Sequence, residues 1–296
     1  MGKSPEGRLD SDDRLKAASP ITSRHNPIVA RFRRALRQGP SLEEPLVLEG
    51  PRLLDDAIAA GVSISLVAVS TSVASLPRVS GVIRRVSPTT DIVVVADRIM
   101  LALSPVTSPS GVVALATAVT SGVDDMVRRH PSLIVGLLGV QDPGNTGAVI
   151  RAVEAGGASG VVTVDGANPF GWKAVRGSMG SVFRLPVVRA PSPIWIREHA
   201  CLSGLRVVAA VPRGGVPLAE TDLRHPSLIW LGAEGPGLTR DLVDTADDLV
   251  SIPMQDPVES LNIAVAAALV VYEAARQRRD DTAITDADRW LGKISG

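Results

Sequence analysis

The sequence of 296 residues predicts an α/β protein whose second half is built on a parallel β-sheet. In that half, short apolar runs rich in β-branched residues are continuous rather than alternating, as in strands buried on both faces. Helical segments separate these runs, as in units that join parallel strands. Glycine and polar residues gather directly after the runs, where ligands bind in sheets of this kind.

The composition limits the class of protein. Hydrophobic residues make up 45% of the chain, enough for a sizeable core, whereas aromatic residues make up only 3%. That excludes an aromatic platform for single-stranded nucleic acid. The only cysteine is Cys201, and the four histidines show no metal-ligand spacing, so we expect neither disulfides nor a metal site. With no apolar run near the length of a membrane span and no signal peptide, we expect a cytoplasmic protein.

The basic residues are unevenly distributed although the formal net charge is zero. Between Arg14 and Arg37 there is no Asp or Glu, and the basic residues are Arg14, Lys16, Arg24, Arg31, Arg33, Arg34 and Arg37. One interpretation is a solvated helix face. The other is a footprint for the phosphates of a nucleic acid.

The first half reads as a small α/β domain over residues 21–120, after a polar, disordered tail at 1–20. Its predicted elements are strands at 45–50, 63–70 and 111–119, a helix at 51–61 and a mixed segment at 92–104. The helix has proline at its first position and glycine just past its end. The polar stretch 121–132 predicts a linker.

The second domain is predicted over residues 133–279, with a C-terminal tail at 280–296. Its strands are predicted at 133–140, 160–166, 205–212, 227–235 and 248–254. Polar or glycine-rich stretches follow them at 142–146, 165–168, 213–215, 232–237 and 255–262.

The first polar stretch opens the segment GNTGAVIRAVEAGG, residues 144–157, which predicts a short apolar helix. Asn145 is a suitable N-cap, and Gly156 or Gly157 a suitable stop. Arg151 lies about two turns inside, among apolar residues. One interpretation is that its aliphatic stem lies along apolar surface and its charged group reaches water. The other is that its charge belongs to a functional site.

The segment LGAEGPGLTRD places Gly232, Gly235 and Gly237 directly after a strand. The spacing is not that of a dinucleotide site. A glycine-rich turn without a ligand is the alternative to a binding loop. The chain also has neither a phosphate-binding P-loop motif nor a G-x-S-x-G nucleophile motif.

The last segment, IPMQDPVESLNIAVAAALVVYEAARQRR, predicts a helix over 258–278. Asp256 as the cap, Pro257 at the first position and Glu259 three residues after the cap would form a capping box. Ser260 and Asn262 are not explained as caps. The helix is then almost wholly apolar to Tyr272, which indicates burial, and a second subunit is one surface that could bury it.

Together and in this order, NTGAVIRAVEAGG, LGAEGPGL and IPMQDPVESLNIAVAAAL resemble the three motifs of the SpoU-type (TrmH-like) RNA 2'-O-ribose methyltransferases of the SPOUT superfamily. KAVRGSMGSVFRLPV, residues 173–187, resembles the segment between the first and second motifs. ITSRHNPIV and LVLEGPRLLDDAIAAG resemble the small substrate-binding domain, similar to a ribosomal protein, of rRNA-directed members. The resemblance covers residues 21–279. It departs from the family at Ala233, where many members have Asn, and at Asp256–Pro257, which replaces a glycine-containing turn.

This resemblance implies a parallel sheet with a deep trefoil knot, a homodimer, and S-adenosylmethionine as the methyl donor without a metal. The implied cofactor-binding residues are Gly232, Ile252 and Leu261, together with Val211, Gly235 and Met254. The implied catalytic residues are Asn145, Arg151, Glu234, Ser260 and Asn262. The expected RNA contacts are Arg24, Arg31, Arg33, Arg34, Lys173 and Arg176. Because a guanidinium stays protonated, we expect Arg151 to clamp phosphate rather than act as a base.

The expected reaction is methyl transfer to a ribose 2'-hydroxyl of large-subunit ribosomal RNA. A tRNA methyltransferase is the alternative substrate assignment, and a non-catalytic RNA-binding or ribosome-assembly protein is the alternative class. The N-terminal domain and its basic segment disfavour a small-molecule methyltransferase.

Overall fold

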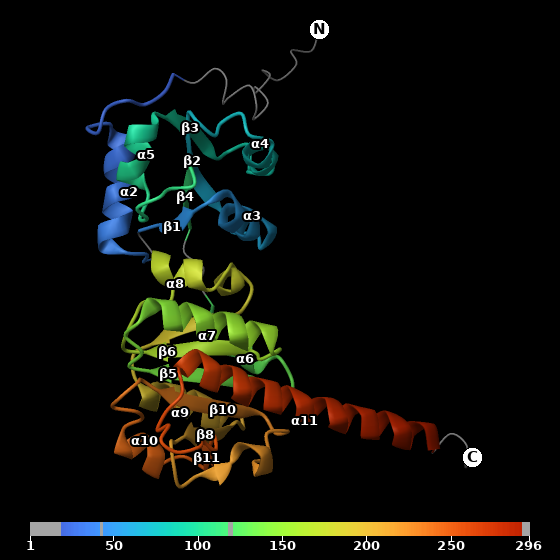
Figure 1. Ribbon diagram of the computed structural model, residues 1–296. Coiled ribbons are helices and arrows are strands. Elements are labelled where there is room, and N and C mark those ends of the chain that lie inside the picture. Colours follow the sequence, from blue (N-terminus) through green and yellow to red (C-terminus); the bar gives the residue numbers. More distant parts are fainter. Residues whose placement is uncertain (1–18, 42–43, 118–120, 292–296) are drawn as a thin grey trace. The chain divides into compact units, whose positions relative to one another are not determined.

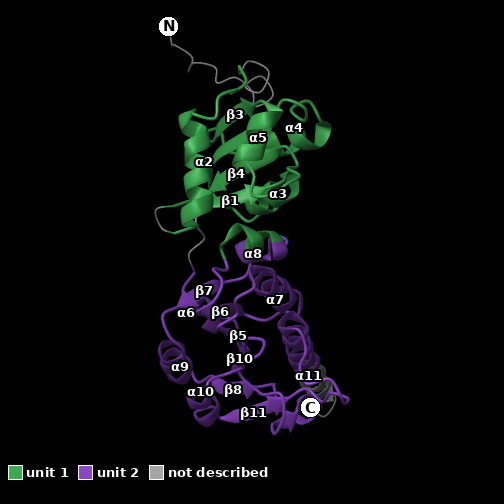
Figure 2. Cartoon of the chain, turned by 60° about the vertical axis from the view of Figure 1, so that its left-hand side comes forward, with its two compact units in different colours: residues 1–119, 170–176 green, residues 120–169, 177–296 purple. Residues whose placement is uncertain are grey.

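The computed structural model describes residues 19–41, 44–117 and 121–291, and only the backbone of 280–291. The chain forms two compact units (Figures 1 and 2). The first comprises residues 1–119 and 170–176, and the second comprises residues 120–169 and 177–296. The predicted disordered tail, with Arg14 and Lys16, lies almost entirely outside the described residues.

The first unit contains a four-stranded sheet of order β1-β4-β2-β3. Its strands are β1 (Leu46–Glu49), β2 (Ile64–Ser70), β3 (Asp91–Val95) and β4 (Val112–Ala116). The central strand β4 runs antiparallel to both neighbours, whereas β2 and β3 are parallel.

Four helices cover this sheet: α2 (Pro27–Gln38), α3 (Pro51–Ala59), α4 (Pro77–Ile83) and α5 (Asp97–Leu103). In Figure 1, α2 and α5 lie on one face of the sheet and α3 and α4 on the other. Val29 and Phe32 of α2 pack with Ile99 of α5 and Leu66 of β2 in one buried cluster. Pro27 at the first turn and Asn26 as the cap fix where α2 begins.

The second unit contains a seven-stranded, wholly parallel sheet of order β7-β6-β5-β10-β8-β11-β9, which confirms the predicted α/β class and the parallel sheet of the second half. Its strands are β5 (Leu133–Leu138), β6 (Gly160–Val164), β7 (Val187–Ala190), β8 (Arg206–Ala210), β9 (Val216–Pro217), β10 (Ser227–Gly232) and β11 (Asp248–Ser251). The strands β6 and β7, which follow β5 in the chain, lie on one side of β5, and β10 and β8 lie on its other side.

Helices cover both faces of this sheet (Figure 2). They are α6 (Val123–Val127), α7 (Pro143–Ala155), α9 (Pro193–Leu202), α10 (Arg240–Asp244) and α11 (Ile263–Leu291), while α8 (Trp172–Gly177) falls mostly in the first unit. Side chains of α6, α9 and α10 join one buried cluster around Trp230. On the other face α7 packs against α11. No helix in the described part of the chain is long and apolar enough to cross a membrane.

Two element boundaries differ from the prediction. The stretch 121–132, expected to be a linker, contains α6, whose Val123 and Met126 are buried in the core of the second unit. Five helical residues are too few to give a periodic signal. The last helix begins at Ile263 rather than Val258 and continues to Leu291, into the expected tail.

The start of α11 is set by Asn262, not by the predicted capping box at Asp256. The side chain of Asn262 accepts a hydrogen bond from the backbone of Ala264 at 2.9 Å, and its carbonyl accepts from Val265 and Ala266. An Asn in this position satisfies a backbone donor that the helix leaves unpaired. The segment before it, with Pro257 and Glu259, has no regular structure.

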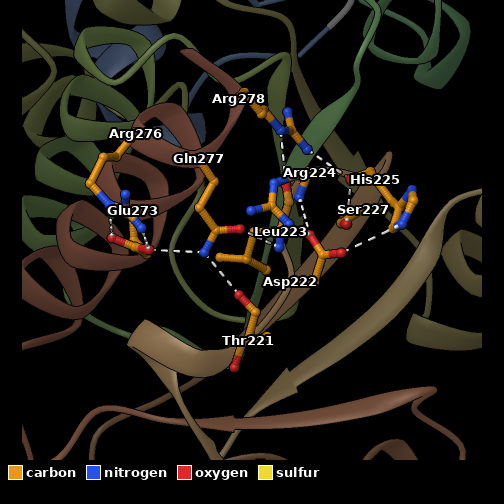
Figure 3. Close-up of polar contacts among 10 residues, drawn as sticks. All are labelled: Thr221, Asp222, Leu223, Arg224, His225, Ser227, Glu273, Arg276, Gln277 and Arg278. Atoms are coloured by element: carbon orange, nitrogen blue, oxygen red, sulfur yellow. Dashed lines mark hydrogen bonds and ion pairs between the residues drawn. The ribbon is translucent and has the colours of Figure 1, made fainter. Parts of the chain in front are cut away.

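In the middle of α11, Gln277 ties the helix to the segment that leads into β10 (Figure 3). Its side chain is 5% exposed. Its Oε1 accepts from the backbone of Leu223 at 2.8 Å, and its Nε2 donates to the carbonyl of Thr221 at 2.9 Å and to Glu273 at 2.8 Å. Hydrogen bonds from Arg276 and then from Gln277 lower the pKa of the Glu273 carboxyl.

Arg278 extends this attachment to a second strand. Its guanidinium donates to the carbonyls of Leu223 and His225, each at 2.9 Å, as Figure 3 shows. It also donates to Pro131 at 2.8 Å and Ser132 at 3.2 Å. Burial lowers the pKa of this guanidinium. Because 221–227 precedes β10 and 131–132 precedes β5, one arginine holds both strand starts against α11.

Replacing Gln277 with leucine removes the partners of a buried N–H at residue 223 and a buried carbonyl at residue 221. Each buried polar group left unpaired costs about 1 to 3 kcal/mol. We therefore expect Gln277→Leu to lower the free energy of unfolding in urea by at least about 2 kcal/mol. Arg276→Gln, in an exposed ion pair one residue away, is the control and should change it by less than about 1 kcal/mol. Equal effects of the two variants would contradict this role of Gln277.

Candidate functional site

The site lies where the strand order reverses in the second unit. β5 and β10 are parallel neighbours, and the chain continues from them to opposite sides of the sheet. At such a point the loops after the two strands diverge and leave a crevice at their carboxyl ends. The loop after β5 leads into α7, and the loop after β10 contains the glycine-rich stretch 232–237.

Three polar side chains from distant segments meet there. The Asn145 amide nitrogen donates to Glu234 Oε1 at 3.1 Å. Asn262 Nδ2 donates to Asn145 Oδ1 at 3.0 Å and to Glu234 Oε1 at 3.3 Å. We call these three residues the amide–carboxylate triangle. Asn145 is half-buried, and the other two are exposed. The triangle therefore faces solvent, and the hydrogen bonds among its three side chains fix its geometry.

The carboxylate is left with an available oxygen. Both hydrogen bonds to Glu234 go to Oε1, and Oε2 has no hydrogen-bond partner in the described part of the chain. An ionised carboxylate accepts several hydrogen bonds. The arrangement thus presents one oriented acceptor to a ligand that carries a hydroxyl or amine.

Asn145 is free for this role because it is not the cap of α7, contrary to the prediction. Asp142 is the cap, and its Oδ1 accepts from the backbone of Asn145 at 2.7 Å. Pro143 occupies the first helical position, and the helix ends at Gly156 as predicted. Both Asp and Asn are good caps. The sequence shows two candidates three residues apart, and only the fold selects between them.

Arg151 lies elsewhere on α7. Its neighbours Val149, Ile150 and Val153 point into the core, but Arg151 itself is exposed. It forms no hydrogen bond or ion pair with any described residue. Ser260 is exposed and likewise makes no hydrogen bond to the triangle. The structure thus brings together three of the five predicted catalytic residues and leaves Arg151 and Ser260 open to solvent.

The glycine-rich loop after β10 folds back on itself. A side chain at Gly232 would collide with the backbone of Gly237 and Leu238. The turn is closed by a hydrogen bond from the Gly237 N–H to the Ala233 carbonyl at 3.0 Å. Gly235 and Gly237 have positive φ values of 95° and 65°, which favour glycine. The close turn explains three glycines without a ligand and leaves the backbone of 234–236 exposed.

The remaining predicted cofactor residues follow neighbouring strands at the same edge. Val211 follows β8, and Ile252 and Met254 follow β11, while Leu261 directly precedes Asn262. All four are half-buried. The loops after β8 and β11 are joined by a hydrogen bond from the Gly215 N–H to Ser251 Oγ at 2.9 Å. Half-exposed apolar side chains therefore follow the strands at the same edge of the sheet as the glycine turn, which is the kind of surface that an organic ligand needs.

The predicted RNA contacts lie in the first unit. Arg24, Arg31 and Arg34 are exposed, and Arg33 is half-buried. Arg34 forms an ion pair with Glu44 at 2.9 Å. Glu44 lies outside the stretch 14–37, which contains no acidic residue. Lys173 and Arg176 on α8 are also exposed. No group of potential metal ligands occurs among the residues that the structure describes.

Comparisons with known proteins add independent findings. The model of the "SpoU rRNA Methylase family" matches residues 132–272. A Synechocystis protein named "uncharacterized tRNA/rRNA methyltransferase" is 31% identical over 265 residues, which cover 87% of this chain and 94% of that protein. A protein of the same description from Mycolicibacterium gilvum is 38% identical over 165 residues, 53% of this chain and 52% of that protein.

Solved structures are similar over both units. A crystal structure of an RNA 2'-O ribose methyltransferase has a TM-score of 0.76 and 31% identity, covering 88% of this chain and 99% of the other. The AdoMet-bound rRNA methyltransferase of Sinorhizobium meliloti has a TM-score of 0.75 and 31% identity, covering 88% and 98%. The SpoU methyltransferase AviRb of Streptomyces viridochromogenes, in complex with AdoMet, has a TM-score of 0.77 and 28% identity, covering 86% and 98%.

The capping role of Asp142 separates stability from the site. We expect Asp142→Ala to lower the free energy of unfolding by about 1 kcal/mol, because it removes the acceptor for the backbone of Asn145. Asn145→Ala removes only solvent-facing hydrogen bonds and should cost clearly less. Urea unfolding of both variants is the measurement. A larger loss of unfolding free energy for Asn145→Ala would show that Asn145, and not Asp142, caps α7.

Proposed function

The chain belongs to the SpoU rRNA methylase family, and we propose that it methylates a ribose 2'-hydroxyl of RNA. Membership makes it an S-adenosylmethionine-dependent RNA methyltransferase. The observation that carries the finer assignment is the amide–carboxylate triangle at the strand-order reversal. It offers an oriented acceptor for a hydroxyl at the edge of the sheet where the predicted cofactor residues gather. The similar RNA 2'-O ribose methyltransferase supports the same reaction.

S-adenosylmethionine, when bound, supplies the electrophilic methyl group. We assign its binding to the backbone around Gly232 and Gly235 and to Val211, Ile252, Met254 and Leu261. The exposed glycine turn and the half-buried apolar side chains at the same edge of the sheet fit such a ligand. In the family this part of the chain forms a trefoil knot, and we propose the same here.

The triangle positions the hydroxyl that receives the methyl group. Asn145 and Asn262 hold Oε1 of Glu234, which leaves Oε2 to accept a hydrogen bond from the 2'-hydroxyl and then its proton as the oxygen receives the methyl group. Holding an acceptor in place removes part of the entropic cost of aligning the two reactants. Ser260, exposed two residues before Asn262, is a further candidate contact.

Arg151 is proposed to bind the phosphate next to the target ribose. It would also stabilise the negative charge that develops on the ribose 2'-oxygen. Its exposure and its lack of a partner among the described residues support this role. A guanidinium binds phosphate through paired N–H groups and stays protonated. It therefore acts by charge and geometry rather than by taking the proton.

Large-subunit ribosomal RNA is the proposed substrate. The similar S. meliloti enzyme is an rRNA methyltransferase, and the first unit carries exposed Arg24, Arg31 and Arg34, which suit an RNA backbone. Transfer RNA is the second candidate, because relatives are named tRNA/rRNA methyltransferases. Incubating the protein with labelled S-adenosylmethionine and with each RNA separates them. Label on a base rather than on a ribose 2'-oxygen would refute the assigned reaction.

The effect of Arg151 on the reaction can be measured directly. We expect Arg151→Ala to reduce methyl transfer by about 10²-fold, as for loss of one charge-stabilising donor, with cofactor affinity unchanged. Arg151→Lys keeps the charge but loses the planar fork, so it should restore only part of the rate. Arg197→Ala, an exposed arginine on α9, is the matched control and should be fully active.

The pH–rate profile of Arg151→Lys distinguishes a clamp from a base. Because a clamp needs the protonated lysine, its rate should fall as the pH rises through the lysine pKa of about 10.4. A rate that rises steeply as the pH approaches that value would show that residue 151 acts as a base. Wild-type activity of Arg151→Ala with a lowered melting temperature would instead make the arginine structural.

The protein is also proposed to be a homodimer through α11. Val265, Leu269 and Tyr272 lie one turn apart on this helix and remain 48%, 43% and 51% exposed. Leu269 and Tyr272 line a cavity of about 490 Å³ together with Leu218, Ile252 and neighbouring residues. An apolar stripe of this kind indicates an association surface.

Light scattering tests this dimer. We expect the wild type to give twice the chain mass of 30.9 kDa at micromolar concentration, and Leu269→Glu to give the monomer mass because it buries a charge in the interface. Leu202→Glu is the control, since Leu202 is 88% exposed on α9, outside the stripe. Dissociation by both variants, or a monomeric wild type, would contradict the assignment.

A further inference from the structure

A second cavity lies at the amino ends of the strands of the same sheet, opposite the edge that holds the triangle. Unlike the cavity at the apolar stripe, it has a polar lining. Its volume is about 490 Å³, and it is bordered by the end of α7 at Gly156–Gly157 and by the start of β5 at Leu133. Asn145 of the triangle is eleven residues before Gly156, so a helical rise of 1.5 Å per residue places them about 16 Å apart. The cavity is therefore separate from the site for methyl transfer.

Basic side chains surround this cavity, and we call it the arginine pocket. No Asp or Glu is among the described residues that line it. Its cationic or titratable members are Arg129, His130, Arg224, Arg278 and Arg279. All of them except Arg278 are exposed at the rim.

These cations differ in how far they are already engaged. Arg278 is taken up by its four backbone carbonyls. Arg224 is 3.5 Å from Asp222, which His225 also approaches at 3.6 Å, as seen in Figure 3. The side chains of Arg129 and Arg279 make no hydrogen bond or ion pair with any part of the chain that the structure describes. Two guanidinium groups are thus available in one cavity.

The end of α7 does not account for these arginines. Cations are often placed at helix C-termini to pair with unsatisfied carbonyls. Here the last turn is closed by its own backbone: the N–H groups of Gly156, Gly157 and Ala158 donate to the carbonyls of residues 152, 154 and 153. Like charges around one cavity repel each other unless an anion joins them.

The walls of the pocket are held in place by the fold. Ser132 Oγ lies 2.7 Å from the carbonyl of Arg129 and 2.8 Å from that of Val127, which fixes the backbone where α6 ends. On the other side, Gln277 and Arg278 attach α11 directly before Arg279. The positions from which Arg129 and Arg279 extend are therefore fixed before any ligand binds.

We propose that the arginine pocket binds a phosphate of the RNA backbone, outside the site for methyl transfer. This inference rests on the proposed function. Guanidinium groups pair with phosphate oxygens through two parallel N–H donors. The exposed rim favours a phosphate within a chain over a small free anion, because sites for small molecules enclose most of their ligand. Among the described lining residues there is no Phe, Tyr or Trp, the side chains that stack most extensively on bases, so we expect contact with the backbone that is independent of sequence.

Salt-dependent RNA binding by the full chain tests the proposal. The variants are Arg129→Gln, Arg279→Gln and the double variant. Loss of one phosphate contact should reduce the slope of log affinity against log salt by about 0.7 to 0.9. We expect this reduction in the double variant, a raised KM for RNA with kcat unchanged, and unaltered cofactor affinity. Lysine at both positions should retain most of the slope, since it keeps the charge.

Arg128→Gln is the matched control. Arg128 precedes Arg129 in the chain, is exposed and is 3.9 Å from Asp125, but it does not line the pocket. An equal change of slope in this control would mean that only overall charge matters and would overturn the site. Melting temperatures of the variants should match the wild type, because both side chains are exposed and form no ion pair within the described ranges.

The outcomes separate this inference from the function on which it rests. If the wild type methylates RNA and the double variant has the same salt slope and KM as the wild type, the proposed phosphate site is refuted and the proposed function is not affected. If the wild type neither binds nor methylates RNA, the function itself fails. If inorganic phosphate at millimolar concentration stabilises the wild type but not the double variant, and the RNA slope is unchanged, the pocket takes free phosphate and the assignment to RNA is overturned.

Discussion

The parallel pairing of β5 with β10 is the constraint on which the rest of the second unit depends. Residues 227–232 pair in register with 133–138, and Trp230 lies over Gly136, where a side chain would collide with the indole ring. The pairing sets the ends of both strands side by side, so that Asn145 and Glu234 meet although 89 residues separate them. It also sets their starts together, which allows Arg278 to bind the carbonyls before both.

Much of the fold could be predicted from sequence because strands buried on both faces leave continuous apolar runs. Helix ends could not. Asp142 and Asn145 are equally good caps, as are Asp256 and Asn262, and the choice in each pair depends on tertiary contacts that local sequence does not contain. The residues of the triangle were identified through resemblance, whereas their mutual hydrogen bonds required the fold. Gln277 and Arg278 were missed because their partners are backbone groups, which leave no trace in side-chain patterns.

Helix α11 connects the two edges of the sheet. Its first residues carry the cap and the amide of Asn262 at the carboxyl edge, and Gln277 and Arg278 anchor it at the opposite edge. Between them its apolar residues pack on α7. Because one rigid element touches the triangle, the apolar stripe and the arginine pocket, its register against α7 fixes all three together.

The double use of Asn262 has a consequence for how this protein loses its working shape. Its side-chain oxygen caps α11 while its nitrogen holds Asn145 and Glu234, so unwinding of one helical turn breaks both sets of hydrogen bonds. Helix ends open far more often than the interior, through local fluctuations that leave the remaining structure intact. The lifetime of the assembled triangle is therefore governed by fraying at a single helix end, at temperatures where the sheet itself remains folded.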